Sequence, residues 1–236
     1  MKKLTISSLF ALSLWTLNAQ QNIYMGFEIG VTNDRFEFFD DGENLINVPL
    51  NDLRLGAMVG YSFNEFLSIE TGFVLKNYTE GFGFELPAHH SSTRATSIRT
   101  WQFPLRIKPR IKLFSDNLFF TPTIGFHYCI NRDHLFRNER ASLGHSSFVN
   151  YSYNVDYTHF RTFPLMETGL GMDMILFNKA KINFTASYFT GFKQVIELDM
   201  VYDVFDGPDI MARGHSKGEY INVSIGIYYP IIGRFR

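Results

Sequence analysis

Apolar residues alternate with polar or small residues over much of this chain, with a period of two. A strand places alternate side chains on opposite faces, whereas a helix cannot gather such a pattern on one face. The first such segment sets Met25, Phe27, Ile29 and Val31 against Gly26, Glu28, Gly30 and Thr32. The pattern recurs and predicts eight strands, at residues 24–32, 53–63, 67–76, 101–110, 120–130, 166–174, 182–188 and 221–229.

The glycines indicate which face of these strands is inside. Alternation alone also suits a soluble barrel with an apolar interior. Nine of the 18 glycines lie on the polar faces and none on the apolar faces: Gly26, Gly30, Gly56, Gly60, Gly72, Gly125, Gly169, Gly171 and Gly226. Because an eight-stranded interior is just wide enough for side chains, large residues there need small neighbours. The polar face is therefore predicted to line the interior, and the apolar, aromatic-rich face to meet lipid.

The connections between the predicted strands alternate between short and long. Short turns are expected at residues 64–65, 115–117 and 177–180, and long polar connections at 33–51, 77–99, 131–162 and 191–218. Short turns on one side and long loops on the other are typical of bacterial outer-membrane barrels with both termini in the periplasm. The predicted fold is an all-β, eight-stranded, antiparallel, transmembrane up-and-down barrel with four long extracellular loops. Pro104, Pro109 and Pro122 lie in predicted strands, where we expect bulges or strand ends.

The start of the chain reads as a secretory signal. Lys2 and Lys3 precede the apolar run Leu4 to Leu17 and then Asn18-Ala19-Gln20, which predicts a signal peptide at 1–19 and a barrel domain at 20–236. The predicted location is the bacterial outer membrane. The single cysteine, Cys129, excludes an intramolecular disulfide. With 22 Lys and Arg, two of them in the signal, against 23 Asp and Glu, we expect no nucleic-acid partner.

Charged residues also lie on the face predicted to be interior. Because a buried charge must be paired or hydrogen-bonded, we interpret them as a structural network that fills the barrel, with a narrow pore or proton-sensitive switch as the alternative. The residues are Glu28, Arg54, Glu70, Lys76, Arg106, Lys108, Arg110, Glu167 and Asp173. No cofactor, metal site or catalytic residue is predicted from them.

One part of the sequence resembles a known family. The stretch LRLGAMVGYSFNEFLSIETGF at 53–73, followed by QFPLRIK at 102–108, resembles the PorT-like, porin-family outer-membrane barrel domain of Bacteroidota. That resemblance implies a small barrel similar in architecture to the OmpA and OmpX type, and one named member is an accessory of type IX protein secretion. It also implies a C-terminal aromatic residue read by the assembly machinery; here Arg236 follows Phe235.

Three functions remain open at this stage. The leading hypothesis is a non-enzymatic barrel with a structural or binding role, followed by a PorT-like secretion accessory. The third is a lipid-A-modifying enzyme, for which His90 with Ser92 and His145 with Ser147 have a suggestive spacing. We expect a monomer whose partners are outer-membrane lipid, lipopolysaccharide and envelope or secretion proteins. The aromatic segments 36–39, 78–84, 148–157 and 201–205 are interpreted as strand extensions above the membrane, with a recognition surface as the alternative.

Overall fold

The computed structural model describes residues 22–48, 50–86, 89–90, 94–132, 137–146, 149–177, 179–203 and 207–235. Within those residues the regular secondary structure is all β. No helix in the described part of the chain is long and apolar enough to cross a membrane. The predicted signal peptide lies outside the described residues.

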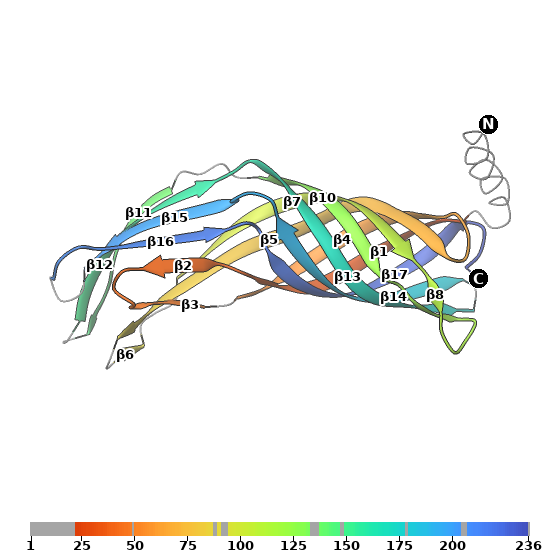
Figure 1. Cartoon of the computed structure of the whole chain (residues 1–236), viewed down its shortest axis with the longest axis horizontal. Helices are drawn as coiled ribbons and strands as arrows, with labels where there is room; N and C mark the ends of the chain where they lie inside the picture. Colours follow the sequence, from red (N-terminus) through yellow and green to blue (C-terminus); the bar gives the residue numbers. More distant parts are fainter. Residues whose placement is uncertain are drawn as a thin grey trace, which may run out of the picture.

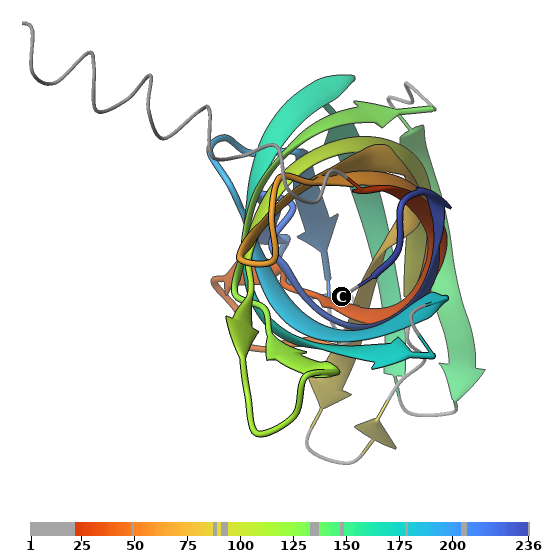
Figure 2. The same cartoon turned by 90° about the vertical axis from the view of Figure 1, so that its right-hand side faces the viewer.

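Eight strands pair in a closed antiparallel ring, as the alternation predicts. They are β1 (Asn22–Asp34), β4 (Asn51–Ser62), β5 (Leu67–Leu86), β7 (Arg94–Pro109), β10 (Thr123–Asn131), β13 (Thr162–Leu176), β14 (Ala180–Gly191) and β17 (Tyr220–Ile232). The pairing of β1 with β17 and of β10 with β13 closes the barrel. Figure 2 looks along the barrel and shows the ring of strands.

The two faces of the strands have the predicted orientation. Along β1 the even-numbered residues from Asn22 to Thr32 are buried in the barrel, while Met25, Phe27, Ile29 and Val31 are exposed on the outside. The same alternation holds in β4, β10 and β17. The outer wall is therefore apolar and the inner wall is polar.

The short turns, Pro109 and Pro122 lie where the sequence indicates, whereas the expected bulge or strand end at Pro104 is not found. The chain reverses at 63–66, within the hairpin that contains β8 (Ile111–Lys112) and β9 (Leu118–Phe120), and around Phe177. Pro109 ends β7, and Pro122 separates β9 from β10. Pro104 stays inside β7, but the ladder between β5 and β7 is interrupted there without a change of register, because proline has no N–H to donate.

The four long connections contain more strand than loop. β5 has 20 residues, about 68 Å at about 3.4 Å per residue, whereas about 10 residues suffice to cross a membrane. β3 (Leu45–Asn47) and β6 (His89–His90) pair with its outer part. Figure 1 shows these extensions reaching far beyond the barrel on the side opposite the short turns.

A second sheet of five strands forms from parts of the connections 33–51, 131–162 and 191–218. Its strands, in spatial order, are β11 (Arg137–Ser146), β12 (Val149–His159), β15 (Ile196–Tyr202), β16 (Ile210–Ser216) and β2 (Glu37–Asp40). β2 pairs with β16 although about 170 residues separate them in the sequence. The aromatic segments expected to extend strands thus lie largely in β2, β5, β12 and β15.

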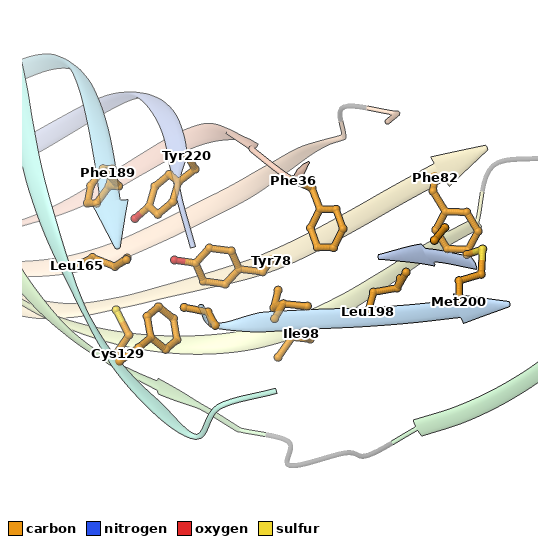
Figure 3. Packing of buried hydrophobic residues seen from close by; sticks show 14 of the residues in the cluster. Phe36, Tyr78, Phe82, Ile98, Cys129, Leu165, Phe189, Leu198, Met200 and Tyr220 are labelled. Atoms are coloured by element: carbon orange, nitrogen blue, oxygen red, sulfur yellow. The ribbon is translucent and has the colours of Figure 1, made fainter. Parts of the chain in front are cut away.

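An apolar core joins the outer mouth of the barrel to this extension. Figure 3 follows it from Phe189 and Tyr220 in the barrel strands to Phe82 and Met200 at the far end. The β2–β3 turn is fixed to β15, because the Tyr202 hydroxyl donates to Asp40 Oδ1 at 2.7 Å. The extracellular part is therefore a packed structure whose core is continuous with the mouth of the barrel.

Candidate functional site

Arg106 is the centre of an ionic cluster in the middle of the barrel. Its Nη1 donates to both oxygens of Glu28, at 2.9 and 3.0 Å, and its Nε donates to Glu167 Oε2 at 2.6 Å. Glu28 also accepts from Arg54 Nη1 at 3.3 Å. Glu167 further bonds His127 Nε2 at 2.7 Å. One guanidinium thus ties β1 to β13 across the lumen, and all of these side chains are buried.

Glycines on the neighbouring strands make room for this cluster. Gly125 is paired with Arg106 on one side and with Glu167 on the other. A Cβ added to Gly125 would lie 3.0 Å from Arg106 Cγ and 3.1 Å from Glu167 Oε2. Glu28 is similarly paired with Gly56 and Gly226. The glycines that indicated the polarity of the wall are spacers for large interior side chains.

A second cluster lies nearer the short turns. Glu70 accepts from Tyr24 OH at 2.9 Å and pairs with Lys108 Nζ at 2.7 Å and Lys181 Nζ at 3.4 Å. Lys181 also lies 3.4 Å from Asp173 Oδ2, which is 3.9 Å from Arg110 Nε. Arg106 Nη1 is 4.0 Å from Glu70 Oε2, so the two clusters are continuous.

Lys76 stands apart from the other predicted network residues. Its Nζ pairs with Asp34 Oδ1 at 2.5 Å and lies over the rings of Tyr78 and Tyr220. Tyr220 stacks on Phe189 with centroids 4.1 Å apart. These aromatic rings form a layer across the outer mouth of the lumen.

The mouth on the side of the short turns is filled by the segment after β17. Phe235 is buried against Tyr24, with ring centroids 5.5 Å apart, and Lys181 lies over its ring. Arg234 N donates to Asn22 Oδ1 at 3.0 Å, which holds the segment to the start of β1. Side chains therefore occupy the lumen at both ends and in the middle.

The nine residues expected to face inward are all buried in the barrel. The structure brings eight of them into the continuous network and places Lys76 with Asp34 instead. Asp34, His127 and Lys181 were not among the expected members. Extending the alternation by one or two residues would have found Asp34 and Lys181, whereas His127 already lies on the polar face of the predicted strand 120–130.

The other candidate chemistry receives no support from the described residues. Those residues contain no group of three or more His, Cys, Asp and Glu that could hold a metal ion. The side chains of His90, Ser92, His145 and Ser147, considered for lipid modification, lie outside what the structure describes. His215 is described, and it pairs with Glu37 at 3.4 Å and stacks on Phe39.

A closed barrel with an apolar wall and a packed ionic interior suits a bilayer and not water. Its backbone groups are paired around the ring, and exposed apolar side chains cover its outside: Phe27, Leu55, Leu105, Ile124, Leu170, Phe184, Val223 and Ile227 among others. Monomeric soluble proteins rarely expose a continuous apolar surface of this kind. These features define an integral β-barrel of the bacterial outer-membrane class.

Comparisons with known proteins add neither a family nor a function. No protein-family model matches the chain, and no curated protein sequence matches it. Among solved structures, OprG from Pseudomonas aeruginosa aligns with a TM-score of 0.49 and 12% identity, over 90% of this chain and 98% of OprG. Neisserial surface protein A aligns at 0.45 and 11%, over 88% and 96%. Ail of Yersinia pestis aligns at 0.32 and 10%, over 88% and 99%.

The strand pairings of the chain itself, rather than these distant likenesses, carry the fold assignment. The resemblance of residues 53–73 and 102–108 to the Bacteroidota family stays a prediction.

Proposed function

We propose that this protein is a non-enzymatic outer-membrane barrel with a structural or binding role, and that the outer face of the five-stranded sheet is its binding surface. The observation that carries the proposal is the contrast between a lumen filled with side chains and a second, well-packed sheet beyond the membrane. A narrow, blocked interior offers no route for solute. The five-stranded sheet, in contrast, lies outside the membrane, where other molecules can reach it.

The outer face of that sheet has the chemistry of a contact surface. Phe39 and Met211 are 64% and 66% exposed. The ring of Phe39 stacks on His215 with an interplanar angle of 6°. On the neighbouring strands, Arg213 pairs with Asp199 at 3.1 Å. Exposed aromatic and apolar anchors surrounded by charged residues are the composition of binding hot spots.

Affinity purification from native membranes tests this role. We expect specific envelope partners with the wild-type chain and their loss with the double variant Phe39→Ala/Met211→Ala. The matched control is Phe114→Ala/Phe177→Ala, which removes two exposed aromatic rings from the short turns at the opposite end. Partners that remain with the first variant and disappear with the control would overturn the assignment of the surface.

A more specific form of the binding role is an accessory function in type IX protein secretion. Its support is the resemblance of residues 53–73 and 102–108 to PorT-like barrels. A deletion strain would then lose secreted cargo from the medium, and expression of the full chain would restore it. Normal secretion in the deletion strain would rule this form out and leave the general proposal standing.

A further inference from the structure

We propose that a rim of basic residues around the extracellular end of the barrel binds the phosphate groups of outer-leaflet lipid. The rim consists of Arg35, Arg99, Arg132, Arg161, Lys193 and Lys217, all of which are exposed. The inference rests on the proposed outer-membrane function and names a partner for it. The partner is a phosphorylated glycolipid of the lipid A type.

Three of these residues lie close together: Arg99 is in β7, Arg132 directly follows β10, and Arg161 directly precedes β13. Arg132 N donates to Arg99 O at 3.0 Å, and Asn131 N donates to Arg161 O at 2.8 Å. Adjacent strands lie about 4.8 Å apart, so the three guanidinium groups can reach one lipid headgroup. Arg99, Arg132 and Arg161 therefore form the centre of the proposed site.

The other members continue the rim around the barrel. Lys193 Nζ lies 5.4 Å from the ring centre of Phe160, which is next to Arg161. Lys217 directly follows β16. Arg35 N donates to Glu219 O at 2.9 Å, just before the start of β17. Arg35 also lies over the ring of Tyr188 at 5.4 Å.

The depth of the rim matches that of lipid headgroups. Trp101, two residues from Arg99, is exposed on the barrel wall, and Phe160 and Phe192 are exposed beside Arg161 and Lys193. Aromatic residues of membrane proteins gather at the interface between hydrocarbon and headgroups. The basic residues thus lie immediately beyond the apolar wall.

Among the residues that the structure describes, none of the six rim residues forms an ion pair. The nearby acid Glu219 accepts a hydrogen bond from Thr190 Oγ1 at 3.1 Å. Other exposed acids lie on the distal sheet and its turns, at Asp41, Glu43, Asp199 and Asp209, whereas Glu37, the exposed acid near Arg35, pairs with His215.

This separation of charge favours an anionic lipid over a soluble anion. Cations surround the barrel at the membrane level, and acids repel anions further out. Arginine binds phosphate oxygens in bidentate fashion, and lysine adds point charge. Each basic residue close to an anionic surface strengthens binding severalfold, so loss of three adjacent ones is expected to weaken it at least tenfold.

Native mass spectrometry of the full chain in phosphatidylethanolamine nanodiscs tests the proposal, with bis-phosphorylated or dephosphorylated lipid A added. We expect the wild-type chain to retain the phosphorylated form preferentially. The variant Arg99→Gln/Arg132→Gln/Arg161→Gln should retain at least tenfold less. The control Lys112→Gln/Lys179→Gln/Arg234→Gln removes the same charge at exposed positions on the side of the short turns and should behave as wild type. Inorganic phosphate at millimolar concentration should not displace the lipid.

Several results would overturn this inference. Equal retention by the wild-type chain and the rim variant, equal retention of both lipid forms, or displacement by inorganic phosphate would each do so. Insertion is measured separately from the fluorescence of Trp101. If the wild-type chain does not insert, the proposed outer-membrane function fails as well, whereas normal insertion with unselective lipid binding removes only the lipid site.

Discussion

Replacement of Arg106 by methionine should destabilise the barrel strongly, because it removes the group that joins two buried carboxylates. Arg106 makes charged hydrogen bonds to Glu28 and Glu167, and a hydrogen bond to a charged group contributes about 1.5 to 3 kcal/mol. Glu28 keeps Arg54, and Glu167 keeps His127, so part of each interaction survives. Since loss of one partner from a buried ion pair costs about 3–5 kcal/mol, we expect a decrease of that size in the free energy of unfolding.

Urea unfolding of the protein refolded in lipid vesicles measures this change. Trp101 is the single tryptophan outside the predicted signal peptide and reports the transition by fluorescence. With an m-value of about 3 kcal/mol/M, the Arg106→Met midpoint should fall by about 1 to 2 M.

The matched control for this experiment is Lys112→Met. It breaks the exposed pair with Asp116 in a short turn and should shift the midpoint by less than about 0.3 M. If Arg106→Met unfolds at the same urea concentration as this control, the interior network does not stabilise the barrel and the reasoning is refuted.

Three further perturbations test other parts of the structure. Gly125→Val should destabilise by about 1–3 kcal/mol because its side chain would push Arg106 from Glu167, and urea unfolding with unchanged stability would contradict the spacer role. Phe27→Arg, on the outer wall, should cost about 2–4 kcal/mol in lipid vesicles, whereas Phe27→Leu should cost little; equal costs would place that face away from lipid. Burial raises the pKa of Tyr202, so the stability contributed by its hydroxyl is present below pH 10 and is lost as the pH rises through the raised pKa. The protection factor of the Leu45 amide, which compares its exchange with that of an unstructured peptide at the same pH, should therefore fall at high pH in the wild-type chain and be low at all pH values in Tyr202→Phe. A protection factor that neither change alters would exclude this anchor.

The membrane barrel could be predicted because its two faces differ at every second residue. In β1, Glu28 and Gly30 on one face indicate an interior that holds charged side chains and needs small residues beside them. In the structure Glu28 is buried in the lumen, and a Cβ at Gly30 would collide with neighbouring side chains. Proline was equally informative: Pro109 and Pro122 mark strand ends, since a residue without N–H weakens a ladder.

The extracellular sheet could not be predicted because the pairings that assemble it, β12 with β15 and β16 with β2, join strands distant in sequence. Glu37 pairs with His215, and no local pattern indicates which of the long connections will meet. In the network, Lys181 was missed because it precedes the clear alternation by one position. Asp34 was missed because the alternation was ended at Thr32, although the strand continues and Asp34 keeps the inward parity.

Planar-bilayer recording on the wild-type chain tests the central claim most directly, namely that this is a membrane-spanning barrel whose lumen is closed. Insertion is verified first, by quenching of Trp101 fluorescence with brominated lipid. The inserted protein should give no channel events, because the Arg106 network, the layer at Tyr220 and the buried Phe235 fill the lumen. A steady single-channel conductance from verified, folded protein would contradict the account.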